Sequence, residues 1–209
     1  MRTAMVEYNV YKFNELSTEA KEKVKQWYLE GQESYIFTDD IKEDLNNLFG
    51  KNDLDVQYSL AYCQGDGLNI YGEIDAVSIL KCLENHNGGT QLAEFENVLT
   101  EKEKKTILNY ASKCGKIKLP YNNRYCYCIA DRINLAEDWE YDLENYSHYK
   151  NIDFDLLNKF EKLVVNIFLE LCGSYEQQGY QYFYEISEED LEEVCEANDY
   201  EFLANGKIF

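Results

Sequence analysis

Two short stretches in the first half of the chain alternate apolar and polar residues, with a glycine-containing segment between them. Leu54, Val56 and Tyr58 begin the first alternation, and a second runs from Leu68 to Ile74. A period of two is typical of half-buried β-strands. The Gln-Gly-Asp-Gly segment at 64–67 supplies the backbone freedom that a tight connection needs. The pattern predicts an antiparallel β-hairpin formed by residues 54–63 and 68–74.

Helices are predicted where apolar residues recur at helical spacing behind a capping residue. Ser17 is an N-cap candidate because Ala20 and Val24 follow it on one stripe, which Gly31 ends. Equivalent patterns predict helices that begin at Thr38, Asp75, Thr100, Asp153 and Ser187. Thr100 also has Glu103 at the spacing of a capping box.

Other segments are predicted to be extended. Residues 6–13, 116–121, 124–130 and 133–141 are candidate strands, although the last alternates poorly. The side chains expected on the buried side of the first are Val6, Tyr8, Val10 and Phe13. The chain is expected to end in a compact hairpin with a type I′ turn at Asn205-Gly206.

These elements together predict an α+β fold. We expect antiparallel β-hairpins to pack with amphipathic helices. Residues 1–209 are expected to form one domain, because no repeat, linker or low-complexity tract interrupts the sequence. The last part of that domain, about residues 131–209, is strongly acidic.

The charge is large and unevenly spread. The chain has 40 acidic and 20 basic residues, a formal net charge of −20. Residues 131–209 hold 20 of the acidic and 5 of the basic residues, a surplus of −15, against −5 in residues 1–130. Such a field repels nucleic acids and anionic membranes and attracts basic proteins. A protein with a basic surface is therefore the predicted partner. We expect the chain to bind neither nucleic acid directly nor a membrane.

Features that would indicate secretion, a metal or catalysis are weak. No basic segment followed by an apolar run opens the sequence, and no apolar stretch approaches the ~20 residues of a membrane span, so a cytoplasmic location in a bacterial host cell is expected. Seven cysteines without a CxxC pair favour reduced, packed thiols. Asp66, Glu73 and Asp75 lack the spacing of a calcium loop. His86 and His148 lie beside no nucleophile motif, so we expect no cofactor, no metal and no enzymatic activity.

The acidic residues near the end of the chain are the candidate partner-binding site. They are Glu185, Glu188, Glu189, Asp190, Glu192, Glu193, Glu196 and Asp199. One interpretation is an ordinary solvated surface. The other is mimicry of a nucleic-acid backbone, since a DNA duplex carries one charge per about 1.7 Å. Tyr175, Tyr180, Tyr182 and Tyr184 are candidates for aromatic contacts beside the carboxylates or for core packing.

Four segments resemble one family of proteins. Residues 11–17, 20–23, 58–67 and 196–202 are similar to proteins carried by phages, plasmids and prophages of Gram-positive bacteria and labelled antitoxin-like; the segment at 58–67 is the most specific. The resemblance implies an origin on a mobile element and assigns no catalytic residue.

The function expected from charge and resemblance together is anti-defence inhibition. The chain would bind the basic nucleic-acid-binding surface of a host nuclease such as a CRISPR effector, as an anti-CRISPR protein that acts as a DNA mimic. The alternatives are an antitoxin or regulatory protein that masks a basic partner, and a cryptic enzyme.

Overall fold

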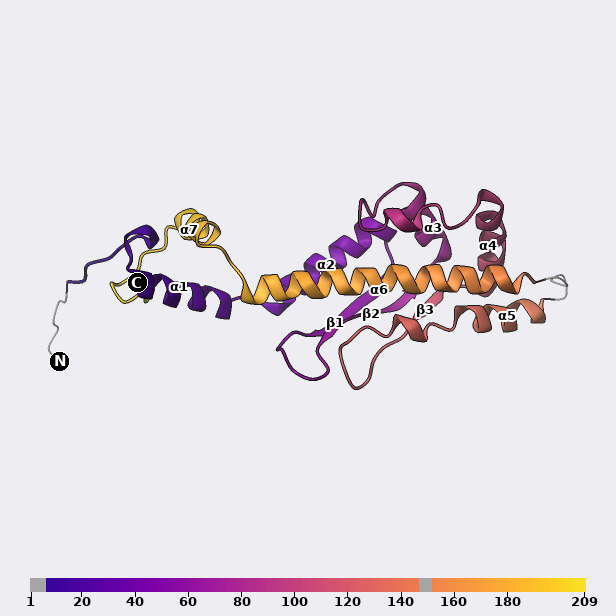
Figure 1. Cartoon of the computed structure of the whole chain (residues 1–209), viewed down its shortest axis with the longest axis horizontal. Coiled ribbons are helices and arrows are strands. Elements are labelled where there is room, and N and C mark those ends of the chain that lie inside the picture. Colours follow the sequence, from indigo (N-terminus) through magenta and orange to yellow (C-terminus); the bar gives the residue numbers. More distant parts are fainter. Residues whose placement is uncertain (1–6, 147–151) are drawn as a thin grey trace, which may run out of the picture. The chain divides into compact units, whose positions relative to one another are not determined.

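The computed structural model describes residues 7–146 and 152–209, and its fold is α+β: helices combine with a three-stranded antiparallel sheet (Figure 1). The chain forms two compact units. The terminal unit comprises Met1–Ser34 and Gly179–Phe209, and the central unit comprises Tyr35–Gln178. The predicted fold class is confirmed. The single domain over residues 1–209 stays a prediction.

The predicted hairpin is the centre of the sheet. Strands β1 (Asp53–Ser59) and β2 (Gly67–Ile74) are antiparallel, with Val56 opposite Ile70. Strand β3 (Ile117–Leu119) pairs with the other edge of β2, where Ile117 lies opposite Ile74. Strand β1 ends at Ser59, short of the predicted residue 63. Tyr58 is half-buried, and the hairpin contributes one face of the core through its buried apolar side chains, which are Leu54, Val56, Leu68, Ile70 and Ile74.

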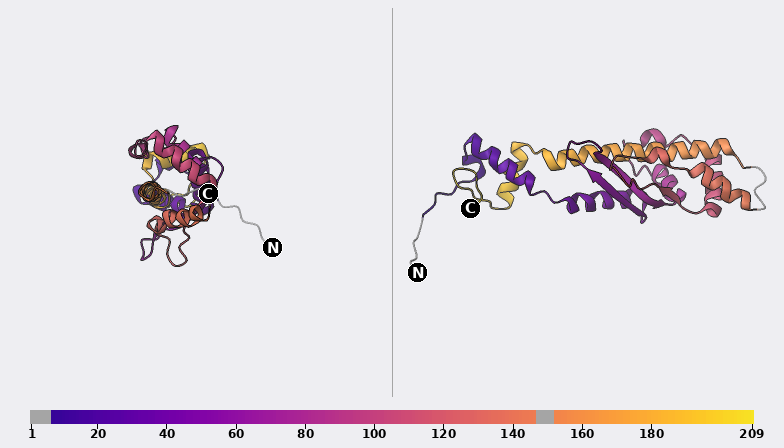
Figure 2. Two further views of the ribbon diagram at one scale, coloured as in Figure 1. Left: turned by 90° about the vertical axis from the view of Figure 1, so that its right-hand side faces the viewer. Right: turned by 90° about the horizontal axis from the view of Figure 1, so that it is seen from below.

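Five α-helices lie wholly or largely in the described part of the central unit. They are α2 (Ser34–Phe49), α3 (Ala76–Glu84), α4 (Glu101–Cys114), α5 (Leu135–Asn145) and α6 (Phe154–Tyr184), whose last residues belong to the terminal unit. Helix α6 runs beside the sheet (Figure 2). It meets α2 at Phe49–Phe168, with ring centroids 5.7 Å apart, and α5 at Trp139–Phe160, with centroids 5.9 Å apart. Its apolar stripe, predicted from Asp153 onward, is the main core-forming face of this unit.

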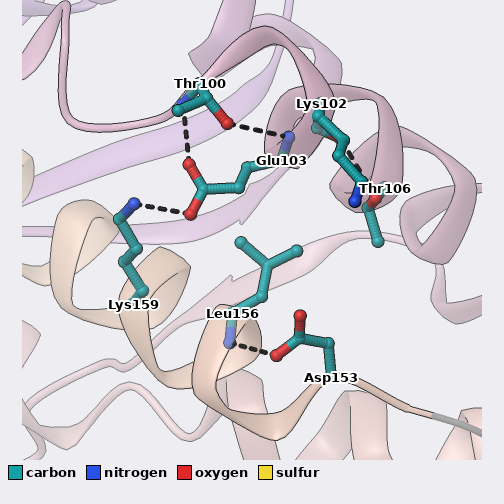
Figure 3. Close-up of polar contacts among 7 residues, drawn as sticks. All are labelled: Thr100, Lys102, Glu103, Thr106, Asp153, Leu156 and Lys159. Atoms are coloured by element: carbon teal, nitrogen blue, oxygen red, sulfur yellow. Dashed lines mark hydrogen bonds and ion pairs between the residues drawn. The ribbon is translucent and has the colours of Figure 1, made fainter.

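The start of α4 is fixed by the predicted capping box (Figure 3). The Thr100 Oγ1 accepts a hydrogen bond from Glu103 N at 3.3 Å, and Glu103 Oε2 accepts one from Thr100 N at 2.7 Å. Glu103 also binds Lys159 of α6, whose Nζ lies 2.6 Å from Oε1. One carboxylate therefore caps α4 and ties it to α6.

The terminal unit packs two helices around its own small core. Helix α1 (Thr18–Glu30) begins at Ser17, which accepts a hydrogen bond from Ala20 N at 3.3 Å, and α7 is Glu188–Ala197. Their buried faces meet around Phe202, which pairs with Tyr11 and with Ile208 in isolated bridges. Among the described residues, no helix combines the length and the apolarity that a membrane span requires.

The prediction of a strand at residues 6–13 is wrong for the residues that are described; Val6 lies outside them. Only Tyr11 pairs with another segment, and the chain then turns into a 3₁₀ helix, η1 (Phe13–Glu15). Phe13 is buried, but Tyr8 and Val10 are exposed.

Two other strand predictions are wrong. Residues 124–130 are irregular and end in the 3₁₀ helix η3 (Ala130–Arg132), and residues 133–141 lie mostly in α5. Leu135, Trp139 and Leu143 are buried and recur every four residues, which is the period of a helix face. The poor alternation of this segment was itself the sign of a helix.

One predicted helix cap and one predicted turn type also differ in the structure. Thr38 is not an N-cap, because α2 begins at Ser34 and the Thr38 hydroxyl lies 3.2 Å from the Tyr58 hydroxyl. The terminal hairpin is present, but its turn is not type I′, since that turn needs a positive φ at both central residues and, of Asn205 and Gly206, Gly206 alone has one, of 83°. Leu203 N donates to Lys207 O at 2.8 Å across a three-residue loop.

Candidate protein-interaction surface

Helix α7 carries most of the predicted partner-binding carboxylates, and its N-terminus is well capped. Ser187 Oγ accepts a hydrogen bond from Asp190 N at 3.0 Å and donates one to Asp190 Oδ2 at 2.6 Å. Glu188, Glu189 and Asp190 occupy the first turn. Negative charges there are favourable because the helix dipole is positive at this end. The acidic sequence therefore stabilises the start of the helix that displays it.

One side of α7 is fixed by packing. Leu191 and Cys195 are buried in the core of the terminal unit. The opposite side presents Glu189, Glu193 and Glu196, which follow the i, i+4, i+7 spacing of a helix face and are all exposed. We call these three residues the acidic stripe. Within the described residues none of the three forms an ion pair.

Lysines of the same unit neutralise other members of the predicted set. Lys21 Nζ of α1 lies 2.5 Å from Glu188 Oε1. Lys12 Nζ lies 3.9 Å from Asp199 Oδ1 and 3.7 Å from Glu201 Oε1. These contacts are exposed and contribute little stability, but they reduce the charge that Glu188 and Asp199 offer to a partner.

The charge density of α7 is comparable with that of a nucleic-acid strand. Six carboxylates lie on its ten residues, which span about 15 Å at 1.5 Å per residue. This gives one negative charge per about 2.5 Å, between the ~1.7 Å of a duplex and the ~3.4 Å of one strand. The stripe alone has fewer charges, with three over about 10 Å.

A hollow of about 480 Å³ lies beside the N-terminus of α7. Its lining consists of Lys25, Gln181, Tyr184, Glu185, Ile186, Ser187 and Asp190. Two predicted carboxylates, Glu185 and Asp190, face it together with one lysine. The hollow has room for a partner's side chain next to these negative charges.

The structure brings the eight predicted residues into one unit, but it divides the acidic region from which they were inferred. Residues 131–178 belong to the central unit, and 179–209 to the terminal unit. Residues 179–209 contain nine acidic residues and one basic residue. Of the eight, Glu192 is half-buried and the others are exposed. The candidate surface therefore consists of α7 and its flanking residues.

The four tyrosines have different environments. Tyr175 is buried in the central unit, where burial is the main cause of a raised pKa. Tyr180 and Tyr182 are half-buried, while Tyr184 is exposed and lines the hollow. Core packing thus explains Tyr175, and contact with a partner remains available to Tyr184.

The residues considered for catalysis or metal binding make contacts within their own loops. Asp66 accepts hydrogen bonds from its own loop, and His86 Nδ1 lies 2.6 Å from Glu96 Oε1; His148 lies outside the described residues. No group of three or more His, Cys, Asp or Glu side chains in the described part of the chain is arranged to hold a metal ion. Cys63 is an exposed thiol, but its hydrogen bond with Asp66 raises its pKa, opposite to the shift that activates a nucleophile.

The lysines that neutralise Glu188 and Asp199 are not predictable from the sequence. Lys21 and Glu188 are 167 positions apart, and no local pattern links them. Comparison with known proteins does not add a second line of evidence: the chain matches no protein-family model, no curated protein and no solved structure.

Proposed function

We propose that this chain is an acidic inhibitor, encoded on a mobile element, that binds the basic nucleic-acid-binding surface of a host defence nuclease in the cytoplasm. The contact is made by the acidic stripe of α7 and the adjoining hollow. A CRISPR effector is the kind of nuclease we expect. The chain itself acts by occupying that surface, not by turning over a substrate.

The observation that carries the proposal is the exposed, internally uncompensated stripe of Glu189, Glu193 and Glu196. A carboxylate row on a capped helix is a preorganised ligand for a groove lined with Lys and Arg, because the charges need not be gathered at the moment of binding. The absence of Lys and Arg from residues 163–206 strengthens the local field. An antitoxin that masks a basic toxin would use the same surface, so the identity of the bound protein separates the two functions.

The test is a binding screen against purified CRISPR effector nucleases, each with and without its guide RNA, by biolayer interferometry. The variant Glu189→Lys/Glu193→Lys/Glu196→Lys should lose binding to a nuclease that the parent binds. The matched control, Glu137→Lys/Asp138→Lys/Glu144→Lys, reverses three exposed carboxylates of α5. Both variants change the formal net charge from −20 to −14, so a difference between them reports position and not total charge. Equal binding by both variants, or no nuclease bound by the parent, contradicts the proposal.

A further inference from the structure

Two loops of the central unit, far apart in sequence, form one surface. Residues 60–66 connect β1 to β2, residues 120–128 follow β3, and both project from the same side of the unit (Figures 1 and 2). Cys126 N donates a hydrogen bond to Gly65 O at 3.1 Å. Gln57 Nε2 donates to the carbonyl oxygens of Asn122 at 2.9 Å and Tyr125 at 3.0 Å.

Both loops are held firmly. The buried Asn69 of β2 donates to Pro120 O at 3.0 Å and accepts from Ile129 N at 3.0 Å, so it fixes the second loop at both ends. Gly67 has a φ of 142°, and a Cβ there would lie 2.7 Å from the Cα of Tyr127. The backbones therefore touch at a position where only glycine fits. A surface fixed in this way loses little conformational entropy on binding.

The loops display tyrosine rings. Tyr62, Tyr121 and Tyr127 are 69%, 54% and 38% exposed. Tyr121 packs edge-on against Tyr71, with ring centroids 4.8 Å apart, and Tyr127 stacks on Tyr125 at 5.5 Å. We call these five residues, four on the loops and Tyr71 on β2, the tyrosine platform. Tyrosine is enriched at protein interfaces because it offers a large rigid ring with a polar end.

The two loops are nearly neutral on a strongly acidic chain, and the charges next to Tyr71, Asp55 and Lys42, form an ion pair with each other at 2.8 Å. Asp66 and Arg124 are the only formally charged residues in segments 60–66 and 120–128. Asp66 is engaged by its own loop, and the Arg124 guanidinium lies 5.1 Å from the Tyr125 ring centroid. That pair shows that a platform ring accepts a guanidinium group on its face.

We propose that the tyrosine platform docks a protein segment that presents arginine side chains, whose guanidinium planes stack on the exposed rings. The negative field of the chain attracts cationic segments, and arginine stacks on aromatic faces better than lysine does. Single-stranded nucleic acid also stacks on aromatic rings, but its binding sites combine them with a positively charged groove, whereas segments 60–66 and 120–128 carry a single cation, Arg124. The inference deepens the proposed function by giving a basic partner a second contact, on the central unit.

The experiment uses the full chain with Glu189→Gln/Glu193→Gln/Glu196→Gln as background, so that the acidic stripe contributes little. The probe is a fluorescein-labelled peptide of alternating Arg and Gly, and fluorescence anisotropy measures its affinity. Adding Tyr62→Ala/Tyr121→Ala/Tyr127→Ala should weaken binding about tenfold or more, the expected loss for several ring–cation contacts. Adding Tyr62→Phe/Tyr121→Phe/Tyr127→Phe should not, because the ring faces remain.

The control is Tyr141→Ala/Tyr146→Ala, which removes two exposed tyrosines of the same unit that lie outside the platform. It should bind as the background does, and a matched Lys-Gly peptide should bind more weakly than the Arg-Gly peptide. The inference is overturned if the platform variant binds like the control, if both peptides bind equally, or if a labelled single-stranded oligonucleotide binds through the same tyrosines. Because the stripe is already neutralised, this outcome is independent of the nuclease screen.

Discussion

Asp66 organises the loop between β1 and β2 by accepting hydrogen bonds from several groups. Its carboxylate receives bonds from Ser59 Oγ at 2.7 Å, Ala61 N at 2.7 Å and Cys63 N at 2.9 Å, and Cys63 Sγ lies 3.0 Å away. These bonds, with that from Ser59 foremost, hold the pKa of Asp66 well below its usual range. Its hydrogen bond with Cys63, followed by desolvation of the thiol and the negative charge of Asp66, in turn raises the pKa of the Cys63 thiol.

Replacement of Asp66 should therefore make Cys63 more reactive. In Asp66→Asn the thiol loses its charged acceptor, and its pKa falls back toward the ordinary range. Alkylation of Cys63 by iodoacetamide, followed by peptide mass spectrometry between about pH 7 and pH 10, should reach half its maximal rate at a lower pH than in the parent, since the thiolate is the nucleophile. Glu73→Gln, at an exposed position on β2, is the control. An unchanged profile in Asp66→Asn would show that Asp66 does not govern this thiol.

Three of the predicted N-caps follow from local sequence, although Thr38 does not cap a helix, whereas residues whose role depends on the fold were not predictable. Ser17, Thr100 and Ser187 each accept a bond from the amide three residues ahead, so their capping follows from the sequence. The pairing of Lys21 with Glu188 depends on how α1 and α7 pack. The role of the eight candidate carboxylates in binding stays a prediction, and the sequence does not show which of them pair with a lysine.

Among the helices, α4 and α6 share one carboxylate. Glu103 closes the capping box with Thr100 and binds Lys159 of α6 (Figure 3). The bond from Lys159 is the first cause, and the bonds from Thr100 the next, of a lowering of the Glu103 pKa to about 2. A carboxyl whose pKa is depressed in the folded state contributes stability above its unfolded pKa, and that contribution is lost as the pH falls through the folded value.

The variant Glu103→Gln should therefore unfold at lower urea concentration than the parent at pH 7. The difference should shrink as the pH falls from about 4.5 toward about 2, because the parent then protonates the same carboxyl. Thr100→Ala should lose about 0.5–2 kcal/mol through the N-cap alone. Circular dichroism at several pH values measures both. Glu94→Gln, an exposed acid outside the cap, should match the parent, and a pH-independent deficit in Glu103→Gln would contradict the assignment.

Elements with strong local patterns were predicted, while the segment at 120–130 was not. Several of its backbone groups bond to the side chains of Gln57 and Asn69 instead of to a neighbouring strand. Sequence alone does not reveal such long-range side-chain bonds. The tyrosine platform, which depends on this arrangement, was missed for the same reason.

The chain as a whole places one tryptophan in each unit. Trp27 lies on α1 of the terminal unit, and the buried Trp139 lies on α5 of the central unit. Helix α6 continues from Gln178 to Gly179 without a break, so its residues belong to both units. Helix formation is cooperative along a continuous segment, and the small core of the terminal unit is marginal for independent folding.

We therefore expect the two units to unfold together. In Trp139→Phe the fluorescence reports Trp27, and in Trp27→Phe it reports Trp139. Within each variant, the urea midpoint from fluorescence should coincide with that from circular dichroism at 222 nm, as in a two-state transition. Comparison inside one variant removes the effect of the substitution on overall stability. Separate midpoints would show two independently folding domains instead of one.

The net charge of −20 acts on association over a longer range than any single contact. At about 0.1 M salt the screening length is ~10 Å, similar to the length of the acidic stripe, so its three carboxylates act together on an approaching cationic surface. Opposed fields raise the association rate more than they slow dissociation. The salt dependence of binding should consequently appear mainly in the association rate constant.

For the nuclease bound in the screen, raising the salt from about 50 mM to about 500 mM should slow association at least about tenfold, with a smaller change in dissociation. In Glu189→Lys/Glu193→Lys/Glu196→Lys this dependence should flatten or reverse, because the local charge that steers the encounter has changed sign. The α5 control carries the same net charge and should keep most of the parent's dependence. Surface plasmon resonance gives both rate constants. A parent association rate that does not respond to salt, or equal flattening in the two variants, would mean that α7 does not guide the encounter.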